Sequence, residues 1–394
     1  MNLIARPSAA GQCVAMDAPR ITDGQHPDAV VLRPLTLRDV EALVEACSDP
    51  ESQRWTRSLP SPYRREDAVA FVARTEAGWA RGSDLTLAVE VVDDHGDPRL
   101  AGTLSLRPDA SGGADVGFML DPWARGRGVM SRALRMMLAF GFTQLDLQVV
   151  HWQAREGNWP SRRVAWACGF AFEGISRGLI ASREGRYDGW LGSIVRGDPM
   201  SPAHPWLSVP EVVGDGVRLR PWSEDDVPRV AEACSDPRTQ QWLPQLPSPY
   251  RLSDAQWYVR SREEQHAVGR GLYWCVADAD DDRCLGSVAL MGLSGTETGA
   301  EVGYWAHPDA RGRGVMSRAA AMAVRHAVLP QEDGGLGLSR VSLRAATGNT
   351  ASGAVARAAG MTRVGVARHG ERLRDGTLTD FDVYDVLPHE VLAP

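Results

Sequence analysis

The sequence contains no lysine: all 43 residues in the combined lysine and arginine count are arginine. A Walker A phosphate loop needs a lysine after its last glycine, and pyridoxal phosphate is commonly held as a Schiff base on a lysine amine. The missing lysine therefore argues against a P-loop NTPase and excludes pyridoxal chemistry through such a Schiff base.

Cysteine is scarce and follows no known pattern. The six cysteines, at positions 13, 47, 168, 234, 275 and 284, show no C-x-x-C motif and no metal-ligand spacing, so we expect no metal site. Cys47 and Cys234 fall at matching places on apolar helical faces. This placement predicts buried free thiols in a reducing cytoplasm.

Long apolar runs are also absent. No stretch of roughly 18 apolar residues occurs, so we expect no membrane span. Residues 1–28 lack the basic-then-apolar pattern of a signal peptide and are expected to form a flexible arm. The formal charge of −7 argues against general nucleic-acid binding and is compatible with a cationic or amine substrate.

What the chain does contain is a duplication. Residues 125–133 recur without change as 311–319, and residues 59–63 recur as 246–250. A repeat of about 190 residues indicates two whole domains and not a solenoid. We therefore predict an N-terminal arm at 1–28, a first domain at 29–196, a proline-rich linker at 197–215 and a second domain at 216–390.

Both copies have the same predicted order of segments. In the first copy we expect strands at about 30–34, 84–92, 99–107, 114–120, 145–154, 170–177 and 187–195, with helices at about 36–47, 65–80, 128–142 and 159–168. In the second copy we expect strands at about 216–221, 271–278, 284–291, 299–306, 338–345, 361–368 and 378–386, with helices at about 223–234, 252–268, 314–328 and 350–359. This order predicts an α/β (α+β) fold in two tandem domains, each a mixed sheet flanked by helices.

Each identical stretch is a glycine-rich turn that opens a helix. The first N–H groups of a helix have no internal partner, the helix dipole adds partial positive charge, and glycine permits a close backbone approach. The residues assigned to such a phosphate site are Arg125, Gly126, Arg127, Gly128, Val129, Met130 and Ser131, and in the second copy Arg311, Gly312, Arg313, Gly314, Val315, Met316 and Ser317. The alternative is a turn that needs glycine only for geometry, but its retention in two divergent halves favours phosphate binding. A dinucleotide fingerprint would need a third glycine where Ser131 stands.

The turn resembles the acyl-CoA loop of the GNAT superfamily of N-acetyltransferases, which reads Gln/Arg-x-x-Gly-x-Gly/Ala. Arg125-x-x-Gly128 and Arg311-x-x-Gly314 fit, with methionine in place of the final small residue. The resemblance spans about 30–196 and 216–388. It implies a mostly antiparallel sheet in each domain, with parallel fourth and fifth strands that splay apart. Acyl-CoA, expected as acetyl-CoA, would enter that gap like an extra strand.

A second motif, Asn-x-x-Ser, starts at Asn158 and at Asn349 and ends at Ser161 and Ser352. Asparagine and serine are ordinary N-cap residues, and a helix cap alone would explain them. The sequence also resembles the GNAT branch that acetylates N-terminal alanines of ribosomal proteins, in which this motif precedes a helix ending in Gly-Phe. That resemblance implies that the asparagines help to hold CoA and that the serines protonate the leaving thiolate.

An amine must be neutral before it attacks a thioester, so a base is needed at pH 7. In this superfamily a carboxylate on the fourth strand usually serves, and the matching residues are Asp115 and Glu301. The alternative is a carboxylate at a strand end that faces solvent. Because glutamate reaches further than aspartate, the second copy is expected to carry the faster chemistry. The resemblance also implies that N–H groups around Met119 and Trp305 stabilise the oxyanion.

The resemblance therefore implies an acyl-CoA-dependent N-acyltransferase in which a primary amine attacks the thioester directly. Two alternatives stay open: one degenerate domain beside one active copy, and a non-catalytic acyl-CoA sensor or scaffold. The sequence does not identify the acceptor, which is a small molecule or a protein N-terminus, nor the acyl chain length or the oligomeric state. In the repeated Leu-Pro-Ser-Pro-Tyr loop, Tyr63 and Tyr250 either belong to a simple chain turn or wall an acceptor pocket.

Overall fold

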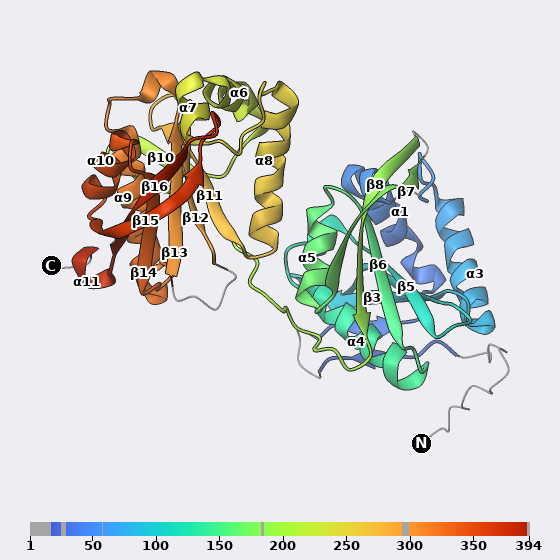
Figure 1. The fold of residues 1–394 in the computed structure, drawn as a ribbon. Coiled ribbons are helices and arrows are strands. Elements are labelled where there is room, and N and C mark those ends of the chain that lie inside the picture. The colour runs from blue at the N-terminus through green and yellow to red at the C-terminus, as the bar shows by residue number, and fades with distance from the viewer. Residues whose placement is uncertain (1–16, 25–28, 57, 183–184, 294–298, 392–394) are drawn as a thin grey trace. The chain divides into compact units, whose positions relative to one another are not determined.

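The computed structural model describes residues 17–24, 29–56, 58–182, 185–293 and 299–391. The chain divides into two compact units, Met1–Ala203 and His204–Pro394, which we call domain 1 and domain 2 (Figure 1). Most of the predicted arm at 1–28 lies outside the described residues. Its described part includes a short strand, β1 (Ile21–Thr22), which pairs with β2.

The described residues of domain 1 form one eight-stranded sheet with the order β1-β2-β3-β4-β5-β6-β8-β7. After β1 the strands are β2 (Val31–Arg33), β3 (Leu85–Val92), β4 (Pro98–Pro108), β5 (Gly113–Leu120), β6 (Val149–Arg155), β7 (Ala171–Ser182) and β8 (Gly185–Val195). The helices are α1 (Val40–Ser48), α2 (Pro50–Trp55), α3 (Arg65–Arg81), α4 (Val129–Gln144) and α5 (Trp159–Ala167), with 3-10 turns η1 (Leu37–Asp39) and η2 (Pro122–Ala124). All neighbouring strands are antiparallel except β5 and β6.

The described residues of domain 2 repeat this sheet in the order β15-β16-β14-β13-β12-β11-β10-β9. The strands are β9 (Val212–Gly214), β10 (Val217–Arg220), β11 (Gly271–Asp278), β12 (Cys284–Met291), β13 (Gly299–Ala306), β14 (Arg340–Ala346), β15 (Thr362–Arg372) and β16 (Leu378–Val386). The helices are α6 (Val227–Ser235), α7 (Pro237–Trp242), α8 (Leu252–Ala267), α9 (Val315–Val328), α10 (Thr350–Ala358) and α11 (Pro388–Val391), with 3-10 turns η3 (Glu224–Asp226), η4 (Pro308–Ala310) and η5 (Gln331–Asp333). The parallel pair is β13 and β14. The predicted fold of two tandem α/β domains is confirmed.

Two short helices, α2 and α7, were not predicted. Each follows an Asp-Pro pair: the Asp49 carboxylate accepts a hydrogen bond from the Ser52 N–H at 2.9 Å, and Asp236 accepts one from the Thr239 N–H at 3.0 Å. Proline fits the first helical position because it needs no hydrogen-bond donor there. Helices of six residues are too short to show an apolar period, so these capping residues are their main sequence signal.

Other boundaries also differ from the predicted ones. Strand β6 begins at Val149 and not at 145, because Asp146 adopts a φ of 58° in a turn after α4. Segments at the two ends of the predicted linker pack on different domains. The Arg135 Nε donates to the Met200 carbonyl at 3.0 Å, and the Trp274 Nε1 donates to the Pro210 carbonyl at 2.8 Å.

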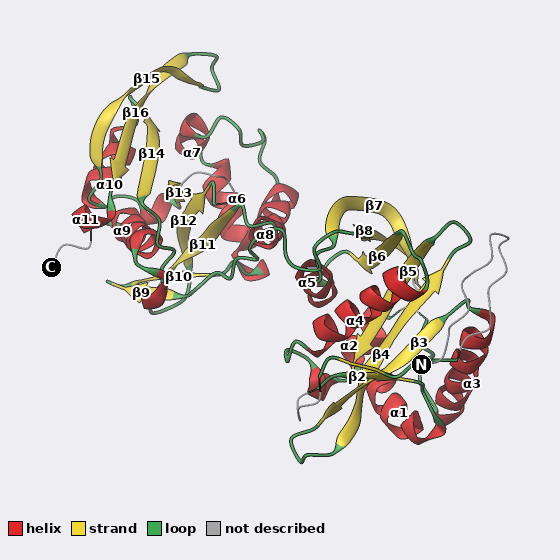
Figure 2. Ribbon diagram, turned by 90° about the horizontal axis from the view of Figure 1, so that it is seen from below, coloured by secondary structure: helices red, strands yellow, loops and turns green. Residues whose placement is uncertain are grey.

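The sheet of domain 1 carries different helices on its two faces (Figure 2). Successive side chains of a strand point to opposite faces. Leu85, Leu87 and Val89 of β3 join the core that contains residues of α4 and α5, whereas Ala88 joins a smaller core with α1 and α3. Domain 2 likewise has α9 and α10 on one face and α6 and α8 on the other. None of the described helices has both the length and the apolar character that a membrane span requires.

A buried ion pair connects the second strand of each domain, β2 or β10, to the 3-10 turn that precedes its first α-helix. In domain 1, Arg33 donates to the two Asp39 oxygens at 2.8 and 2.7 Å and to Glu90 at 2.7 Å. All three side chains are buried. Burial alone would raise the pKa of Asp39, but hydrogen bonds from Arg33 and from the backbone outweigh it and hold the pKa below its ordinary value. Arg220 and Asp226 form the corresponding pair in domain 2.

Replacement of Asp39 by alanine should destabilise domain 1 by roughly 3 kcal/mol, because Arg33 then loses two buried charge-assisted hydrogen bonds and keeps Glu90 as its charged partner in the interior. The lowered folded-state pKa of Asp39 means that its stabilisation is complete above the unfolded-state pKa of about 3.9 and is lost as pH falls through the folded-state value. Urea unfolding at pH 7 and at acid pH would measure both effects. The difference in unfolding free energy between wild type and variant should narrow at acid pH.

Glu45→Ala is the control for this prediction. Glu45 is 62% exposed and pairs with Arg99 on the surface, so its loss should cost about 1 kcal/mol or less. Equal destabilisation by Glu45→Ala and Asp39→Ala would show that the buried pair contributes no more to the free energy of unfolding than the surface pair does.

Candidate active site

Strand β5 loses its hydrogen-bonded neighbour on one side halfway along its length. It pairs with β6 from Gly113 to Val116, and Val116 lies opposite Trp152. Beyond this point residues 117–120 pair only with β4, while β6 continues beside β8 as far as Arg155. Among the described residues, the backbone groups of 117–120 that face β6 therefore have no ladder partner. Such an open edge can accept an extended chain.

Domain 2 has the same opening. Strand β13 pairs with β14 only from Gly299 to Glu301, where Glu301 lies opposite Ser342. Residues 302–306 pair with β12 alone, while β14 continues beside β16 as far as Ala346. The gap expected between the parallel strands is thus present in both domains.

The glycine turn of domain 1 leads from β5 into α4. Gly126 and Gly128 have φ values of 74° and 70°, in the left-handed region that favours glycine. Gly128 is the N-cap of α4, and no side chain caps the helix. A β-carbon added to Gly128 would meet nothing within 4 Å. The N–H groups of Val129, Met130 and Ser131 therefore form an uncapped first turn that faces open space, as an anion site requires.

The corresponding turn of domain 2 has the same backbone. Gly312 and Gly314 have φ values of 71° and 70°, and Gly314 is the N-cap of α9 without a side-chain cap. Val315, Met316 and Ser317 form the first turn. One difference is that a β-carbon on Gly314 would lie 3.1 Å from an Arg318 guanidinium nitrogen. The Arg318 guanidinium thus lies beside the turn of domain 2, whereas the corresponding Arg132 of domain 1 pairs with Asp23 at 2.6 Å.

The arginines that begin the two turns point away from the helix N-termini. The Arg125 Nη2 donates to Asp49 at 2.6 Å and to the Ser52 hydroxyl at 2.9 Å. The Arg311 Nη2 donates to Asp236 at 2.6 Å and to the Thr239 hydroxyl at 2.7 Å. Each guanidinium therefore connects its glycine turn to the N-cap of α2 or α7. The contact of these two side chains with a diphosphate stays a prediction.

The second arginine of each turn is exposed. The Arg127 guanidinium lies 3.4 Å from Asp94, whose side chain is 86% exposed. Arg313 makes no ion pair with any residue that the structure describes. Both side chains are consequently able to reach an anion bound at the turn.

The Asn-x-x-Ser motifs cap α5 and α10. The Asn158 Oδ1 accepts a hydrogen bond from the Ser161 N–H at 3.2 Å, and the Asn349 Oδ1 accepts one from the Ser352 N–H at 3.3 Å. The helix-cap interpretation therefore explains both asparagines. Their contact with CoA stays a prediction.

The two serine hydroxyls have different partners. In domain 1 the Trp152 Nε1 donates to the Ser161 Oγ at 3.0 Å, which leaves the serine proton able to point elsewhere. In domain 2 the Tyr304 hydroxyl donates to the Ser352 carbonyl at 3.0 Å and lies 3.0 Å from the Ser352 Oγ. Burial raises the pKa of Tyr304 to about 12, so this hydroxyl stays protonated. Either hydroxyl can donate in the second contact, so Tyr304 is able to accept the proton of Ser352.

The two candidate bases also differ in their surroundings. Glu301 accepts hydrogen bonds from the Arg344 Nε at 3.2 Å and Nη2 at 2.8 Å, so both of its oxygens are engaged. Asp115 is exposed and forms no ion pair with a described residue, and Gln153 stands where domain 2 has Arg344. Asp115 is therefore the carboxylate that is free to accept a proton.

The remaining predicted residues lie on the face opposite α4 or α9. Met119 packs against the core of α1 and α3, and Trp305 packs against the rings of other aromatic residues near α6 and α8. Tyr63 and Tyr250 are only 8% and 9% exposed and belong to these same cores. The tyrosines thus occupy core positions, which supports the simpler role of their loop as a chain turn.

Sequence reasoning missed the partners of the predicted residues. Asp49 and Trp152 in domain 1, and Tyr304 and Arg344 in domain 2, each make a side-chain contact with a residue that the motifs had identified. Asp49 has a sequence signal, because its Asp-Pro pair is repeated ahead of α7. For the others the signal lies only in strand register, which a single sequence does not specify.

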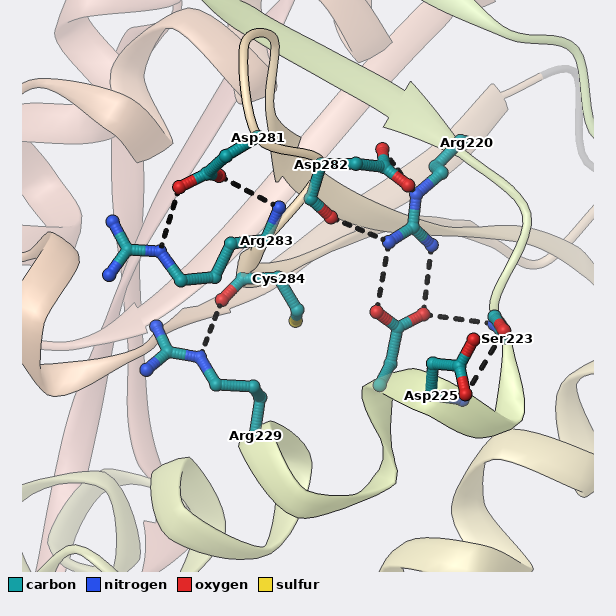
Figure 3. Close-up of a pocket in the computed structure, with 9 residues that line it drawn as sticks. Arg220, Ser223, Asp225, Arg229, Asp281, Asp282, Arg283 and Cys284 are labelled. Carbon is teal, nitrogen blue, oxygen red and sulfur yellow. Dashed lines mark hydrogen bonds and ion pairs between the residues drawn. The ribbon is translucent and has the colours of Figure 1, made fainter.

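A hollow of about 260 Å³ lies elsewhere in domain 2, near the turn between β11 and β12 (Figure 3). It is lined by Arg220, Ser223, Asp225, Asp226, Arg229, Asp281, Asp282, Arg283 and Cys284. Arg220 donates to Asp226 and Asp282, Arg229 donates to the Cys284 carbonyl, and Arg283 pairs with Asp281. The three arginines are therefore paired with groups of the hollow itself.

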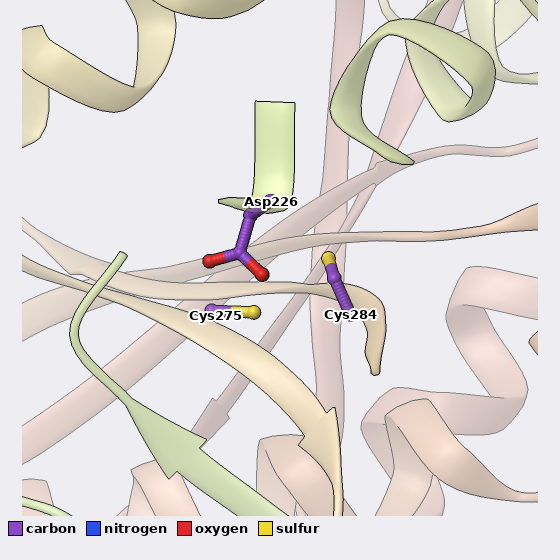
Figure 4. Close-up of side chains that lie close together, drawn as sticks. All are labelled: Asp226, Cys275 and Cys284. Carbon is purple, nitrogen blue, oxygen red and sulfur yellow. The ribbon is translucent and has the colours of Figure 1, made fainter. Parts of the chain in front are cut away.

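Beside this hollow, Asp226, Cys275 and Cys284 bring their side chains together (Figure 4), with possible ligand atoms all within 4.8 Å of one another. Carboxylate and thiolate are ligands that Zn²⁺ accepts. However, both Asp226 oxygens accept hydrogen bonds from Arg220, at 2.8 and 2.9 Å, and that positive charge opposes a bound cation. Burial also raises the pKa of the Cys275 thiol, which favours its neutral form. The cluster is therefore best explained as an ion pair beside two thiols.

In each domain the sheet opens between two parallel strands, and an uncapped glycine turn follows the first strand of that pair. These two features define the class of protein. A model of the acetyltransferase (GNAT) domain matches residues 29–171 and 217–362, which together are more than half of the chain. The protein belongs to this family and is an N-acetyltransferase.

The relatives that follow each match a stretch of this chain that is no longer than one domain. The probable N-acetyltransferase YjcK of Bacillus subtilis is 36% identical over 84 residues, which are 21% of this chain and 46% of YjcK. The putative ribosomal N-acetyltransferase YdaF of the same species is 26% identical over 185 residues, 45% of this chain and 94% of YdaF. The structure of Mycobacterium smegmatis RimJ in complex with CoA-disulfide is 21% identical, with a TM-score of 0.39, and the match covers 45% of this chain and 86% of that one.

Gly128→Val should weaken CoA binding by domain 1 roughly tenfold or more, and Gly314→Val should do the same in domain 2. Valine strains a left-handed backbone and places its branches in front of the uncapped N–H groups. Calorimetric titration with CoA should find one site in each single variant and none in the double variant.

Gly197→Val is the control, because Gly197 also has a positive φ, 98°, and open space around it, but lies after β8 and away from the turns. It should keep both sites. Two sites of unchanged affinity in the Gly128→Val/Gly314→Val double variant would exclude the turns as the binding site.

Proposed function

We propose that the protein transfers an acyl group, which we take to be acetyl, from CoA to a primary amine by direct attack of the amine on the thioester. The observation that carries the proposal is the open edge of β5 and of β13, each followed by an uncapped helix N-terminus. The family supplies the general reaction class. The acceptor and the roles of single residues are our own assignment.

The two helix N-termini and the two open strand edges are suited to bind acyl-CoA. When bound, it supplies an acyl thioester that an amine can attack. The N–H groups of residues 129–131 and 315–317 would hold the diphosphate, since no side chain caps either helix and each first turn carries the positive end of a helix dipole. Among the described residues, 117–119 and 302–306 have no ladder partner on the side of β6 or β14, and their backbone would hold the extended arm as a strand does. The Leu120 carbonyl already accepts hydrogen bonds from the Arg125 Nε and Nη2, at 3.2 and 3.1 Å.

The acceptor amine must lose a proton, and Asp115 is the group that we assign to accept it in domain 1. Glu301 has the corresponding position in domain 2, but its carboxylate is held by Arg344. Backbone N–H groups around Met119 and Trp305 would stabilise negative charge on the carbonyl oxygen. Ser161 and Ser352 would return a proton to the leaving sulfur. We favour Ser161, because the Trp152 Nε1 can only donate to its hydroxyl, whereas the Tyr304 hydroxyl can accept the proton of Ser352.

These differences support the view that one copy is faster than the other. The sequence suggested the second copy, because glutamate is longer. The contacts of Glu301 and Ser352 favour domain 1 instead, and domain 2 would then bind acyl-CoA with slower transfer. A non-catalytic sensor is the competing function, and it would bind CoA in both domains without releasing thiol.

The acceptor that we propose is a protein N-terminus or a small-molecule amine. Relatives include a putative ribosomal N-acetyltransferase, which supports the first choice. We place the reaction in the cytoplasm, where the buried free thiols of Cys47, Cys168, Cys234, Cys275 and Cys284 would stay reduced.

Release of CoA thiol from acetyl-CoA, followed against a panel of amines and N-terminal peptides, tests the proposal directly. An enzyme should release thiol only in the presence of an acceptor and at a rate proportional to enzyme concentration. Binding of CoA without any acceptor-dependent thiol release across the panel would support the sensor function instead.

Asp115→Asn should lower turnover on the order of 10²-fold, because the variant cannot accept the amine proton. The ascending limb of the pH–rate profile should disappear with it. Glu301→Gln should have a smaller effect, since the wild-type carboxylate is already engaged. If Glu301→Gln silences the enzyme while Asp115→Asn is harmless, domain 2 is the faster copy and the sequence-based expectation was right.

Arg344→Gln gives domain 2 the residue that domain 1 has at this position. It should release the Glu301 carboxylate and raise the turnover that survives in an Asp115→Asn background. Initial rates of thiol release in the double variant would measure this gain. No gain, with the fold intact by circular dichroism, would show that the Arg344 contact does not limit Glu301.

A further inference from the structure

Arg107 of β4 lies over the part of β5 where the open edge begins. Its Nη1 donates to the Ser105 hydroxyl at 3.0 Å, and the Ser105 hydroxyl donates to the Gly117 carbonyl at 3.3 Å. A β-carbon added to Gly117 would lie 3.1 Å from both Nη1 and Nη2 of Arg107. Gly117 is the first residue of β5 beyond the last pair with β6. The guanidinium is therefore placed beside the gap.

The Arg107 charge has no carboxylate partner among the described residues. Asp115 lies directly across from it in the β4–β5 ladder, yet no ion pair joins the two side chains. Arg107 is exposed, and the Ser105 hydroxyl is its hydrogen-bond partner. By contrast Arg99, on the same strand, pairs with Glu45 at 2.8 Å. A guanidinium without a carboxylate partner is suited to bind a carboxylate from outside the chain.

The face of the sheet on which Asp115 lies indicates from which side an acceptor would approach. Along β5, residues 115, 117 and 119 point to one face of the sheet, and Val116 and Phe118 point to the other. Val116 and Phe118 pack toward the core that contains α4, and Met119 packs toward α1 and α3. The glycine turn leads into α4. An acceptor that meets the thioester through the gap would therefore come from the α1–α3 face, where Asp115 and Arg107 lie together.

Domain 2 differs at this point. Strand register places Met291 opposite Glu301, as Arg107 is opposite Asp115, and places Ala289 opposite Gly303, as Ser105 is opposite Gly117. The Met291 methyl carbon lies 2.8 Å from where a β-carbon on Gly303 would be. A thioether thus covers the strand in domain 2 at the place where a guanidinium covers it in domain 1.

We propose that Arg107 binds a carboxylate of the acceptor, so that domain 1 selects amines that carry a carboxylate close to the amino group, such as peptides with an acidic residue next to the N-terminus. Domain 2, with Met291 at that place, has no such preference. This inference rests on the proposed acyl transfer and names the acceptor class of that same site. Arg107 is a specificity-determining residue, and Asp115 remains the base.

The test uses the full chain with acetyl-CoA and two peptide amides, Ala-Glu-amide and Ala-Gln-amide, which differ in one negative charge. Wild type should acetylate the acidic peptide with a kcat/KM about tenfold or more above that of the neutral one, the usual worth of a charge-assisted hydrogen bond. Arg107→Met should remove this preference through KM, leaving the neutral peptide and the KM for acetyl-CoA unchanged. Arg99→Met is the matched control and should keep the preference. The reciprocal Met291→Arg should increase it.

The outcomes separate the two levels of the proposal. Thiol release with equal kcat/KM for both peptides, or a preference that survives in Arg107→Met, would overturn the role of Arg107 and leave acyl transfer standing. The absence of thiol release with any acceptor would overturn both. Thermal unfolding of each variant would confirm that Arg107→Met is folded, as expected for an exposed side chain.

Discussion

The end of the hydrogen-bond ladder between two parallel strands is the feature on which each domain depends. A strand whose edge is unpaired is normally a liability, because its N–H and C=O groups seek another chain. Here the ladder stops after Val116 in β5 and after Glu301 in β13, inside a sheet that is otherwise continuous. The exposed segment is short and lies close to the helix N-terminus that follows. The two features together provide a place for an extended ligand with an anionic end.

The two domains retain this backbone and differ in the side chains around it. Phe118 and Gln153 in domain 1 correspond to Tyr304 and Arg344 in domain 2, and these exchanges change the partners of the candidate serine and carboxylate. The same opening is thus surrounded by two different sets of charges. Within the described part of the chain, domain 1 has a carboxylate and a guanidinium that form no ion pair, whereas domain 2 has a paired carboxylate beside a thioether. Duplicated domains can share a ligand and still differ in what they do with it.

The sequence was sufficient for the fold and for the backbone of the site. The exact repeat predicted two domains. The alternating strand patterns, and the glycine turn before an apolar helical face, predicted the positions of α4 and α9 to within a few residues. The sequence did not predict which side chains contact the candidate site residues. Arg125 was expected to face an anion because charge alone indicated this, but the cap of α2, a helix too short to show a period, holds it. The contacts of Arg344 and Trp152 depend on strand register and on where the hydrogen-bond ladder ends, which a single sequence does not specify.

The contact between Arg125 and Asp49 has a consequence for how the two copies have diverged. Asp49 caps α2 through the Ser52 N–H, and Arg125 binds both Asp49 and the Ser52 hydroxyl. Domain 2 has the same three-part contact, with threonine in place of serine. A change in either charged partner alone would leave the other unsatisfied, so drift at these sites needs two steps at once. The exchanges around the opening, such as Gln153 in domain 1 for Arg344 in domain 2, leave this contact intact, so the copies can differ in their candidate catalytic residues while each glycine turn stays joined to α2 or α7.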